Sequence, residues 1–203
     1  TSELVGEFGV LKLLAGVAAV CIRGVSLERL LTILPSLEPV PGRMQIVSQN
    51  VLPTVVVDYS HTPDALKKAL ISLRQHCLGE LVCVFGCGGD RDSGKRPQMG
   101  HIAEQLADKV VVTSDNPRSE DPQVIVDEIL LGMTELKNVR VIVDRREAID
   151  TAISEAEDND CILIAGKGHE EYQQIGTDKL PFNDLEIART ALQKRSVHGE
   201  DGR

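Results

Sequence analysis

Residues 113–122 bring together side chains that could recognise a small zwitterion. The segment is Thr-Ser-Asp-Asn-Pro-Arg-Ser-Glu-Asp-Pro, and its Asn-Pro pair predicts a turn. A turn accounts for Pro117 but not for the presence of Asp115, Asn116 and Arg118 in one loop. Aspartate can hold an ammonium group, and arginine can bind a carboxylate through two hydrogen bonds. The loop therefore suits the head group of an amino acid.

A glycine-rich segment carries three cations within six residues. Gly-Cys-Gly-Gly-Asp-Arg-Asp begins at Gly86, and Arg91, Lys95 and Arg96 supply the positive charge. Glycines let backbone N–H groups approach an anion. The pattern is neither a phosphate-binding G-x-x-x-x-G-K-[ST] loop nor a dinucleotide fingerprint, because Arg91 stands where the third glycine would be. An anion site is favoured over a plain tight turn.

Two further polar clusters allow both a structural and a functional interpretation. In the segment 165–171, Gly166 could offer its backbone and Glu170 could bind an ammonium group, although a simple turn would also explain them. In the segment 58–65, Asp58 could cap a turn and His61 could be a structural histidine. Both interpretations stay open for each cluster.

The elements that position these clusters alternate regularly. Short apolar runs predict strands at 54–58, 81–85, 109–113, 139–143 and 161–165. Amphipathic runs predict helices at 62–74, 97–107, 121–132, 145–156 and 184–194. This alternation indicates a doubly wound α/β fold with a mostly parallel, Rossmann-like sheet. Every polar cluster follows a strand, so we expect all four to meet at one edge of the sheet.

The amino-terminal part is expected to be a separate helical fragment. Helices are predicted at 11–20 and 27–34, and the prolines at 35, 39 and 41 with Gly42 mark a linker. We therefore assign residues 1–38 to the fragment, 39–195 to the α/β domain and 196–203 to a disordered polar tail. The first residue is threonine rather than methionine, which suggests a piece of a longer protein.

Composition excludes several classes of protein. The net charge of −9 over 203 residues argues against a nucleic-acid partner and against a polybasic membrane anchor. We find no signal peptide and no apolar run long enough to span a bilayer. The five cysteines include no C-x-x-C pair, which favours reduced thiols in a cytoplasmic protein. Aromatic residues make up only 2% of the chain, so its core must be aliphatic.

Four motifs together resemble the carboxy-terminal part of MurE-type Mur ligases. They are VVVDYSHTPDAL, FGCGGDRDSGKRPQMG, TSDNPRSEDP and AGKGHEEYQ, in this order and spacing. The resemblance runs from Pro41 to about Lys194. Upstream, Gly6-Glu7-Phe8 and the following helix resemble the end of the family's central ATPase domain, which would make residues 1–38 a remnant of that domain.

The resemblance implies an ATP-dependent acid–amino-acid ligase of cytoplasmic peptidoglycan precursor synthesis, and hence a role in cell-wall formation, cell shape and division. In this family, ATP phosphorylates the D-glutamate carboxylate of UDP-MurNAc-L-Ala-D-Glu, and the amine of meso-diaminopimelate attacks the acyl phosphate. ATP and Mg²⁺ would be bound mainly by the central domain. The expected partners are these small molecules, with neither nucleic acid nor membrane, and the expected state is a monomer.

The resemblance also implies two groups of site residues. The expected meso-diaminopimelate site comprises Arg91, Asp115, Asn116, Pro117, Arg118, Gly166 and Glu170. The expected contacts on the ATP side are Arg43, Asp58, His61 and Lys95. Diaminopimelate differs from lysine by a second carboxylate, for which Arg118 and Arg91 provide the counter-charge, while Asp115 and Glu170 balance the distal ammonium. No catalytic residue and no metal ligand is assigned within this chain.

Two departures from the family pattern keep an alternative open. The G-x-x-x-x-G-K-[ST] loop is missing, so this chain alone is not expected to hydrolyse ATP. Gly9 and Lys12 stand where the family carries two asparagines near the adenine. A non-catalytic homologue acting as an assembly or regulatory subunit is therefore the alternative. A nicotinamide-dependent dehydrogenase is a weaker one, because the third glycine of its fingerprint and the usual acid after the next strand are missing.

Overall fold

The structure, a computed structural model, describes the backbone of residues 7–36, 40–48 and 53–200. Its contacts divide the chain into two compact units, Thr1–Val40 and Pro41–Arg203. The first unit contains α1 (Glu7–Ile22), α2 (Leu27–Ile33) and a short 3-10 helix (Leu34–Ser36). Both predicted helices form, and α1 is longer than expected. The origin of this unit in an ATPase domain stays a prediction; Gly6, Pro39 and the surroundings of Gly9 and Lys12 lie outside the described part.

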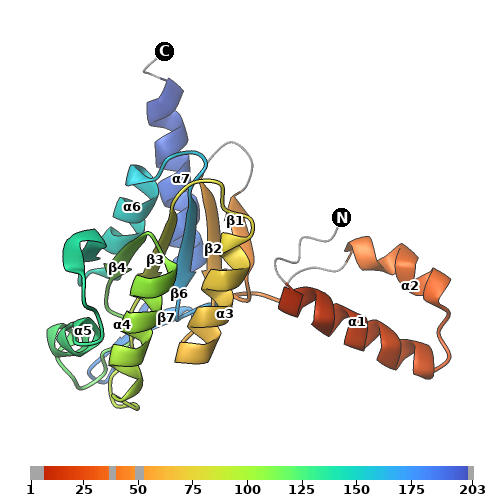
Figure 1. Ribbon diagram of the computed structural model, residues 1–203, viewed down its shortest axis with the longest axis horizontal. Helices are drawn as coiled ribbons and strands as arrows, with labels where there is room; N and C mark the ends of the chain where they lie inside the picture. The colour runs from red at the N-terminus through yellow and green to blue at the C-terminus, as the bar shows by residue number, and fades with distance from the viewer. Residues whose placement is uncertain (1–6, 37–39, 49–52, 201–203) are drawn as a thin grey trace. The chain divides into compact units, whose positions relative to one another are not determined.

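A six-stranded sheet forms the centre of the second unit (Figure 1). Its strands, in spatial order, are β1 (Gln45–Ser48), β2 (Thr54–Asp58), β6 (Cys161–Ala165), β3 (Leu81–Phe85), β4 (Lys109–Val112) and β5 (Val139–Val141). The strand β1 pairs antiparallel with β2, and all other pairs are parallel. In the middle of the sheet, Leu163 lies between Val56 and Cys83. The five predicted strands are present, and β1 adds an antiparallel edge that was not predicted.

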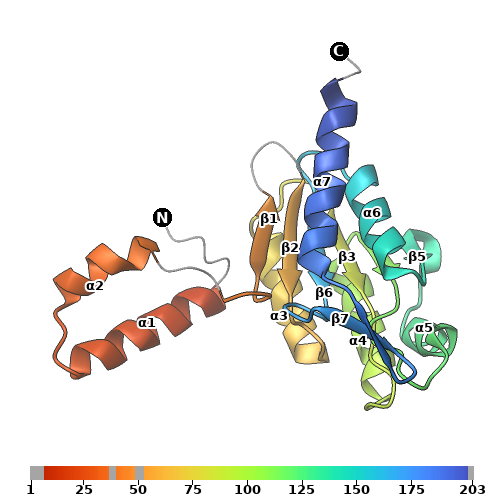
Figure 2. The same ribbon diagram turned by 180° about the vertical axis from the view of Figure 1, so that it is seen from behind.

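Helices cover both faces of this sheet, as a doubly wound fold requires (Figure 2). One face packs against α3 (Pro63–Arg74), α4 (Lys95–Leu106) and α5 (Pro122–Leu130). The other packs against α6 (Arg145–Glu155) and α7 (Asp184–Glu200). Strands β3 and β6 are buried along their whole length, which explains their uninterrupted apolar sequences. The predicted fold class is confirmed.

Local sequence signals set where these helices begin. The side chains of Thr62, Asp121 and Asp144 accept hydrogen bonds from the first backbone N–H groups of α3, α5 and α6. Proline follows the cap in α3 and α5, where a missing N–H is tolerated. Each of these three helices begins directly after a loop at the carboxyl end of a strand.

Two parts of the structure differ from the expectation. The last helix continues to Glu200, beyond its expected end at residue 194. The disordered tail at 196–203 stays a prediction, and residues 201–203 lie outside the described part. A two-stranded hairpin, β7 (Tyr172–Ile175) and β8 (Asp178–Pro181), was not predicted. The five cysteines are free thiols. Within the described residues, no helix has the length and apolarity needed to cross a membrane.

Candidate functional site

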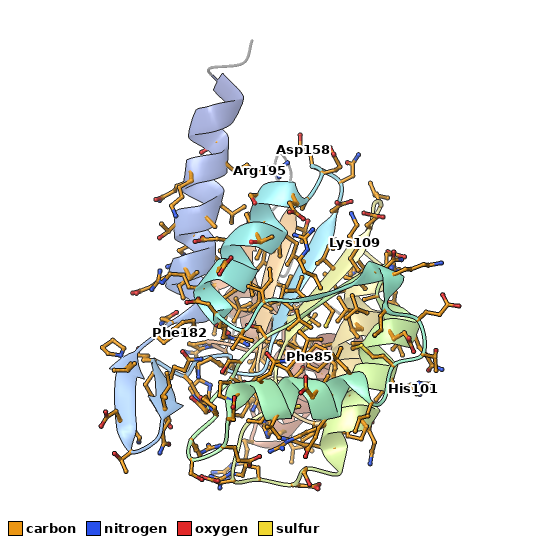
Figure 3. All side chains as sticks on the ribbon, turned by 90° about the vertical axis from the view of Figure 1, so that its left-hand side faces the viewer. Phe85, His101, Lys109, Asp158, Phe182 and Arg195 are labelled. Atoms are coloured by element: carbon orange, nitrogen blue, oxygen red, sulfur yellow. The ribbon has the colours of Figure 1, made fainter. Side chains whose placement is uncertain are left out.

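The four polar clusters lie together at the carboxyl edge of the parallel sheet. Backbone hydrogen bonds join them in pairs: the N–H of Gly166 donates to Asp58 at 3.0 Å, and the N–H of Gly89 donates to Asn116 at 2.9 Å. In Figure 3, Phe182 marks this edge, and Lys109 and Asp158 mark the opposite one. The prediction that the clusters converge on one edge is confirmed.

The hairpin β7–β8 fixes the loop from Ser114 to Arg118. The N–H of Arg118 donates to Gln174 at 3.1 Å, and the N–H of Gly176 donates back to Arg118 at 2.6 Å. The side-chain amide of Gln173 donates to the carbonyl of Asp115 at 2.8 Å. These bonds hold Arg118 at a φ of 53°, a conformation rare for residues other than glycine. A polar, half-exposed hairpin thus determines where Arg118 presents its side chain.

Arg118 and Arg91 flank the same glycine. A Cβ atom on Gly88 would lie 2.9 Å from Nη1 of Arg118 and 3.8 Å from Cγ of Arg91. Arg118 donates to the carbonyl of Gly89 at 2.6 Å, and Arg91 donates to the carbonyl of Asp90 at 3.0 Å. Both arginine side chains therefore lie against Gly88, Arg118 through its guanidinium group and Arg91 through its Cγ.

A second network, of ion pairs and hydrogen bonds, supports the loop that carries Arg91. The buried Arg96 binds Glu120 at 2.8 Å and Glu128 at 2.8 Å. Glu120 in turn accepts from the N–H of Asp90 at 2.5 Å. The hydroxyl of Ser119 donates to Asp90 at 2.6 Å and lowers the pKa of that carboxyl. Arg96, counted at first among the cations of the anion loop, is thus a structural residue.

The acidic side of the site lies at the ends of β4 and β6. Asp115 and Asn116 are buried, and Glu170 is half-buried. The amide of Asn116 donates to Oε2 of Glu170 at 2.8 Å. Gly166 has a φ of 121°, and a Cβ there would lie 2.6 Å from Oδ2 of Asp115, so glycine leaves room for this carboxylate. Burial raises the pKa of Asp115.

Pro117 is buried, and its contribution is the shape of the loop. Its carbonyl accepts from the N–H of Glu120 at 3.1 Å and closes the turn that the Asn-Pro pair predicted. The same carbonyl lies against Gly89, where any Cβ would collide with it. The loops after β3 and β4 can therefore pack closely only with glycine at this position.

The residues expected on the ATP side form a neighbouring group at the end of β2. The guanidinium of Arg43 lies 4.7 Å from the ring centre of Tyr59, which in turn lies 4.5 Å from the ring of His61. Lys95 donates to the carbonyl of His61 at 2.8 Å. Asp58 accepts from the N–H of Met44 at 2.7 Å and also from the Ser60 hydroxyl. Asp58 thus shapes the turn, whereas Arg43 and Lys95 supply positive charge.

Several residues of the site were not predicted from the sequence. They are the fully buried Lys167, the buried pair Arg145–Asp184, and the hairpin residues Gln173 and Gln174. One feature of the sequence could have indicated Lys167: it stands between two glycines just after a buried strand. Within the described residues, no three histidine, cysteine, aspartate or glutamate side chains are arranged to hold a metal ion.

The fold and this edge define a doubly wound α/β domain with charged and glycine-rich loops at the carboxyl ends of its parallel strands. The model of the family described as "Mur ligase, glutamate ligase domain" matches residues 42–168. The chain therefore belongs to the Mur ligase family.

Individual relatives resemble most of the chain. It is 51% identical over 192 residues to a UDP-N-acetylmuramoyl-L-alanyl-D-glutamate–2,6-diaminopimelate ligase of Coxiella burnetii, covering 95% of this chain and 39% of that protein. A protein of the same name from Haemophilus influenzae is 53% identical with the same coverage. A solved structure under this name shares 42% identity with a TM-score of 0.77, covering 97% of this chain and 40% of the other. The chain thus spans well under half the length of these relatives.

Proposed function

We propose that this chain supplies the amino-acid site of an ATP-dependent ligase that adds meso-diaminopimelate to UDP-MurNAc-L-Ala-D-Glu. The observation that carries the proposal is the arrangement of charge. Arg118 and Arg91 lie against Gly88 after β3, and Asp115 and Glu170 lie in the loops after β4 and β6 at the same edge of the sheet. Diaminopimelate carries a carboxylate and an ammonium at its distal end, so it complements both pairs of side chains, whereas lysine would leave the guanidinium groups unmatched.

The role of each site residue follows from its position. We assign the distal carboxylate to Arg118 and Arg91 and the distal ammonium to Asp115 and Glu170. Asn116 fixes Glu170, and Gly166 and Pro117 give the site its shape. The names of the similar proteins from Coxiella burnetii and Haemophilus influenzae support this choice of substrate.

We further propose that ATP is approached from the end of β2. Arg43 is exposed and Lys95 half-buried, so both can meet a phosphate, while Asp58 and His61 hold the turn between them. Positioned cations are the main requirement of phosphoryl transfer. We expect Mg²⁺ to accompany the ATP and to be bound mainly by the central domain of the whole ligase. We expect the whole ligase to be a cytoplasmic monomer that acts in peptidoglycan precursor synthesis.

Calorimetric titration of the full-length protein tests the proposal. We expect heat on adding meso-diaminopimelate and none on adding L-lysine at the same concentration. Equal heats of binding for lysine and diaminopimelate would refute the assignment of the distal carboxylate to Arg118 and Arg91. Heat with neither amino acid, while ATP still binds, would favour the alternative of a non-catalytic homologue.

A further inference from the structure

Lys167 is a fully buried lysine at the centre of the acidic side of the site. It follows β6 between Gly166 and Gly168, and its side chain has an exposed fraction of 0%. Its Nζ lies 2.9 Å from Oδ1 of Asn116, 3.3 Å from Oε2 of Glu170 and 3.9 Å from Oδ1 of Asp115. All three partners belong to the site proposed above. A buried ammonium therefore contacts three residues that are expected to belong to the ligand site.

The ammonium of Lys167 and the backbone N–H of Gln174 together determine how Asn116 is oriented. An ammonium group only donates hydrogen bonds, so the carbonyl end of the amide must face it. That carbonyl also accepts from the N–H of Gln174 at 2.8 Å. The amide nitrogen is then turned toward Glu170, to which it donates at 2.8 Å. Lys167 thus fixes Glu170 directly and a second time through Asn116.

The same ammonium sets the charge of the buried cluster. Arg145 and Asp184, both fully buried, form a pair at 2.8 Å beside it. In the whole cluster two cations, Arg145 and Lys167, face three carboxylates, those of Asp115, Glu170 and Asp184. One negative charge is left in excess. One ligand ammonium would neutralise it, and a site without Lys167 would carry two excess charges.

We propose that Lys167 is a positioning residue that prepares the site for one ligand ammonium, by orienting Asn116 and Glu170 and by limiting the excess charge to one. The inference rests on the proposed function. Burial raises the pKa of Asp115 and lowers the pKa of Lys167, so each charge in this cluster depends on its partners. The rings of Tyr172 and Phe182, 5.8 and 5.9 Å from Nζ, close the remaining side of the ammonium.

The test replaces Lys167 with methionine, which keeps the length of the side chain and removes its charge, in the full-length protein. We expect the KM for meso-diaminopimelate to rise on the order of tenfold or more, because a buried hydrogen-bonded charge is lost. The KM for ATP is expected to change less than about twofold, since the residues near Arg43 are untouched. Lys137→Met, which removes an exposed lysine outside the site, is the matched control and should leave both values unchanged.

A double variant separates charge from simple damage to the fold. Lys167→Met alone leaves two excess charges, and adding Glu170→Gln brings the cluster back to one. The combined loss should therefore be no larger than the greater single loss. Losses that multiply would overturn the proposal. If Lys167→Met does not fold, Lys167→Gln, which keeps a donor but no charge, takes its place in both measurements.

Failure of this inference can be distinguished from failure of the proposed function. A wild-type protein that does not use diaminopimelate refutes the proposed function. A wild-type protein that does use it, with folded Lys167→Met and Lys167→Gln variants of unchanged KM, refutes only the role of Lys167.

Discussion

Arg118 combines an uncommon backbone conformation with a side chain directed into the site. Its φ of 53° is held by hydrogen bonds to Gln174 and Gly176 of the hairpin. Non-glycine residues in this region carry strain of about 1–3 kcal/mol, which the surrounding structure must offset. Such strain is common where a side chain has to be aimed at a ligand. The hairpin therefore positions a residue of the proposed amino-acid site, although its own side chains are mostly exposed.

Replacing Arg118 with alanine should remove diaminopimelate binding selectively. The truncation deletes the main counter-charge of the distal carboxylate, and loss of one partner of a buried charge pair costs about 2–5 kcal/mol, which is on the order of a hundredfold in affinity. ATP binding should be unaffected. Calorimetry with each ligand measures both effects, with Arg189→Ala on the exposed face of α7 as the control. An unchanged affinity for diaminopimelate would show that the loop from Ser114 to Arg118 is not the amino-acid site.

At the scale of elements, Arg145 joins three segments that are distant in sequence. It begins α6, pairs with Asp184 at the start of α7, and donates to the carbonyl of Ala165 at the end of β6 at 3.0 Å. Both side chains of the pair are fully buried. The Arg145–Asp184 pair thus holds the two helices of one face against the edge that carries the site.

Breaking this pair should destabilise the fold strongly. Arg145→Met leaves Asp184 buried and unpaired, which costs about 3–5 kcal/mol. The double variant Arg145→Met/Asp184→Leu should lose less free energy of unfolding than Arg145→Met, because no isolated charge stays buried. Urea denaturation gives the free energy of unfolding for each. Arg140→Ala, which breaks an exposed pair with Glu155, should cost less than about 1 kcal/mol. Equal losses for Arg145→Met and Arg140→Ala would contradict this account.

The sequence was sufficient to predict the elements whose residues are all buried or capped. Strands such as Leu81–Phe85 are continuous apolar runs, and helices such as Pro63–Arg74 carry a cap and an early proline. It was insufficient for the hairpin Tyr172–Pro181, whose residues are largely polar and which is held by contacts with Arg118. Tertiary contacts, not local preference, stabilise such an element.

The residues of the candidate site also divide into those that the sequence pointed to and those that it did not. Asp115 and Arg118 were identified because a turn did not explain their charges. Arg145 was missed because a charged residue in the sequence carries no sign of burial. Lys167 was missed although it stands between two glycines after a buried strand, because buried lysines are rare. Arg96 was interpreted as part of an anion site, yet its partners Glu120 and Glu128 lie more than twenty residues away.

At the scale of the whole molecule, several carboxylates link folding to pH. Hydrogen bonds from Arg96 lower the pKa of Glu120, and the backbone N–H of Glu135 lowers that of Glu104. A glutamate whose pKa is lower in the folded state stabilises the fold at pH values above its pKa in the unfolded chain, about 4.3. This stabilisation is lost as the pH falls through the pKa of the folded state.

Glu120→Gln should therefore destabilise the protein at pH 7 and progressively less below about pH 4. The difference in the free energy of unfolding between the variant and the wild type reports on Glu120 alone. Burial raises the pKa of Asp115, so that residue contributes in the opposite direction, but it does so equally in both proteins. Guanidinium denaturation between pH 7 and pH 3 measures it. Glu135→Gln, at an exposed side chain, should differ little from the wild type throughout. A loss for Glu120→Gln that does not shrink at low pH would exclude this linkage.

The two compact units differ in how many apolar side chains they bury. Every residue of the two hydrophobic clusters belongs to Pro41–Arg203. In the first unit, α2 has no buried residue among those described, and apolar side chains such as Leu14, Ile22 and Leu31 are exposed. Helices that bury as little apolar surface as the described residues of this unit do are marginal in water. The larger unit should therefore keep its fold without residues 1–40.

We expect a protein comprising residues 41–203 to unfold with a free energy within about 1 kcal/mol of that of residues 1–203, since both hydrophobic clusters found among the described residues lie within it. A peptide of residues 1–40 alone should be largely unfolded, because its apolar helices bury too little surface to offset the loss of chain entropy. Urea titration followed by circular dichroism measures both. A cooperative transition in the 1–40 peptide, or a loss of several kcal/mol on its removal, would show that the helices α1 and α2 contribute to a shared core.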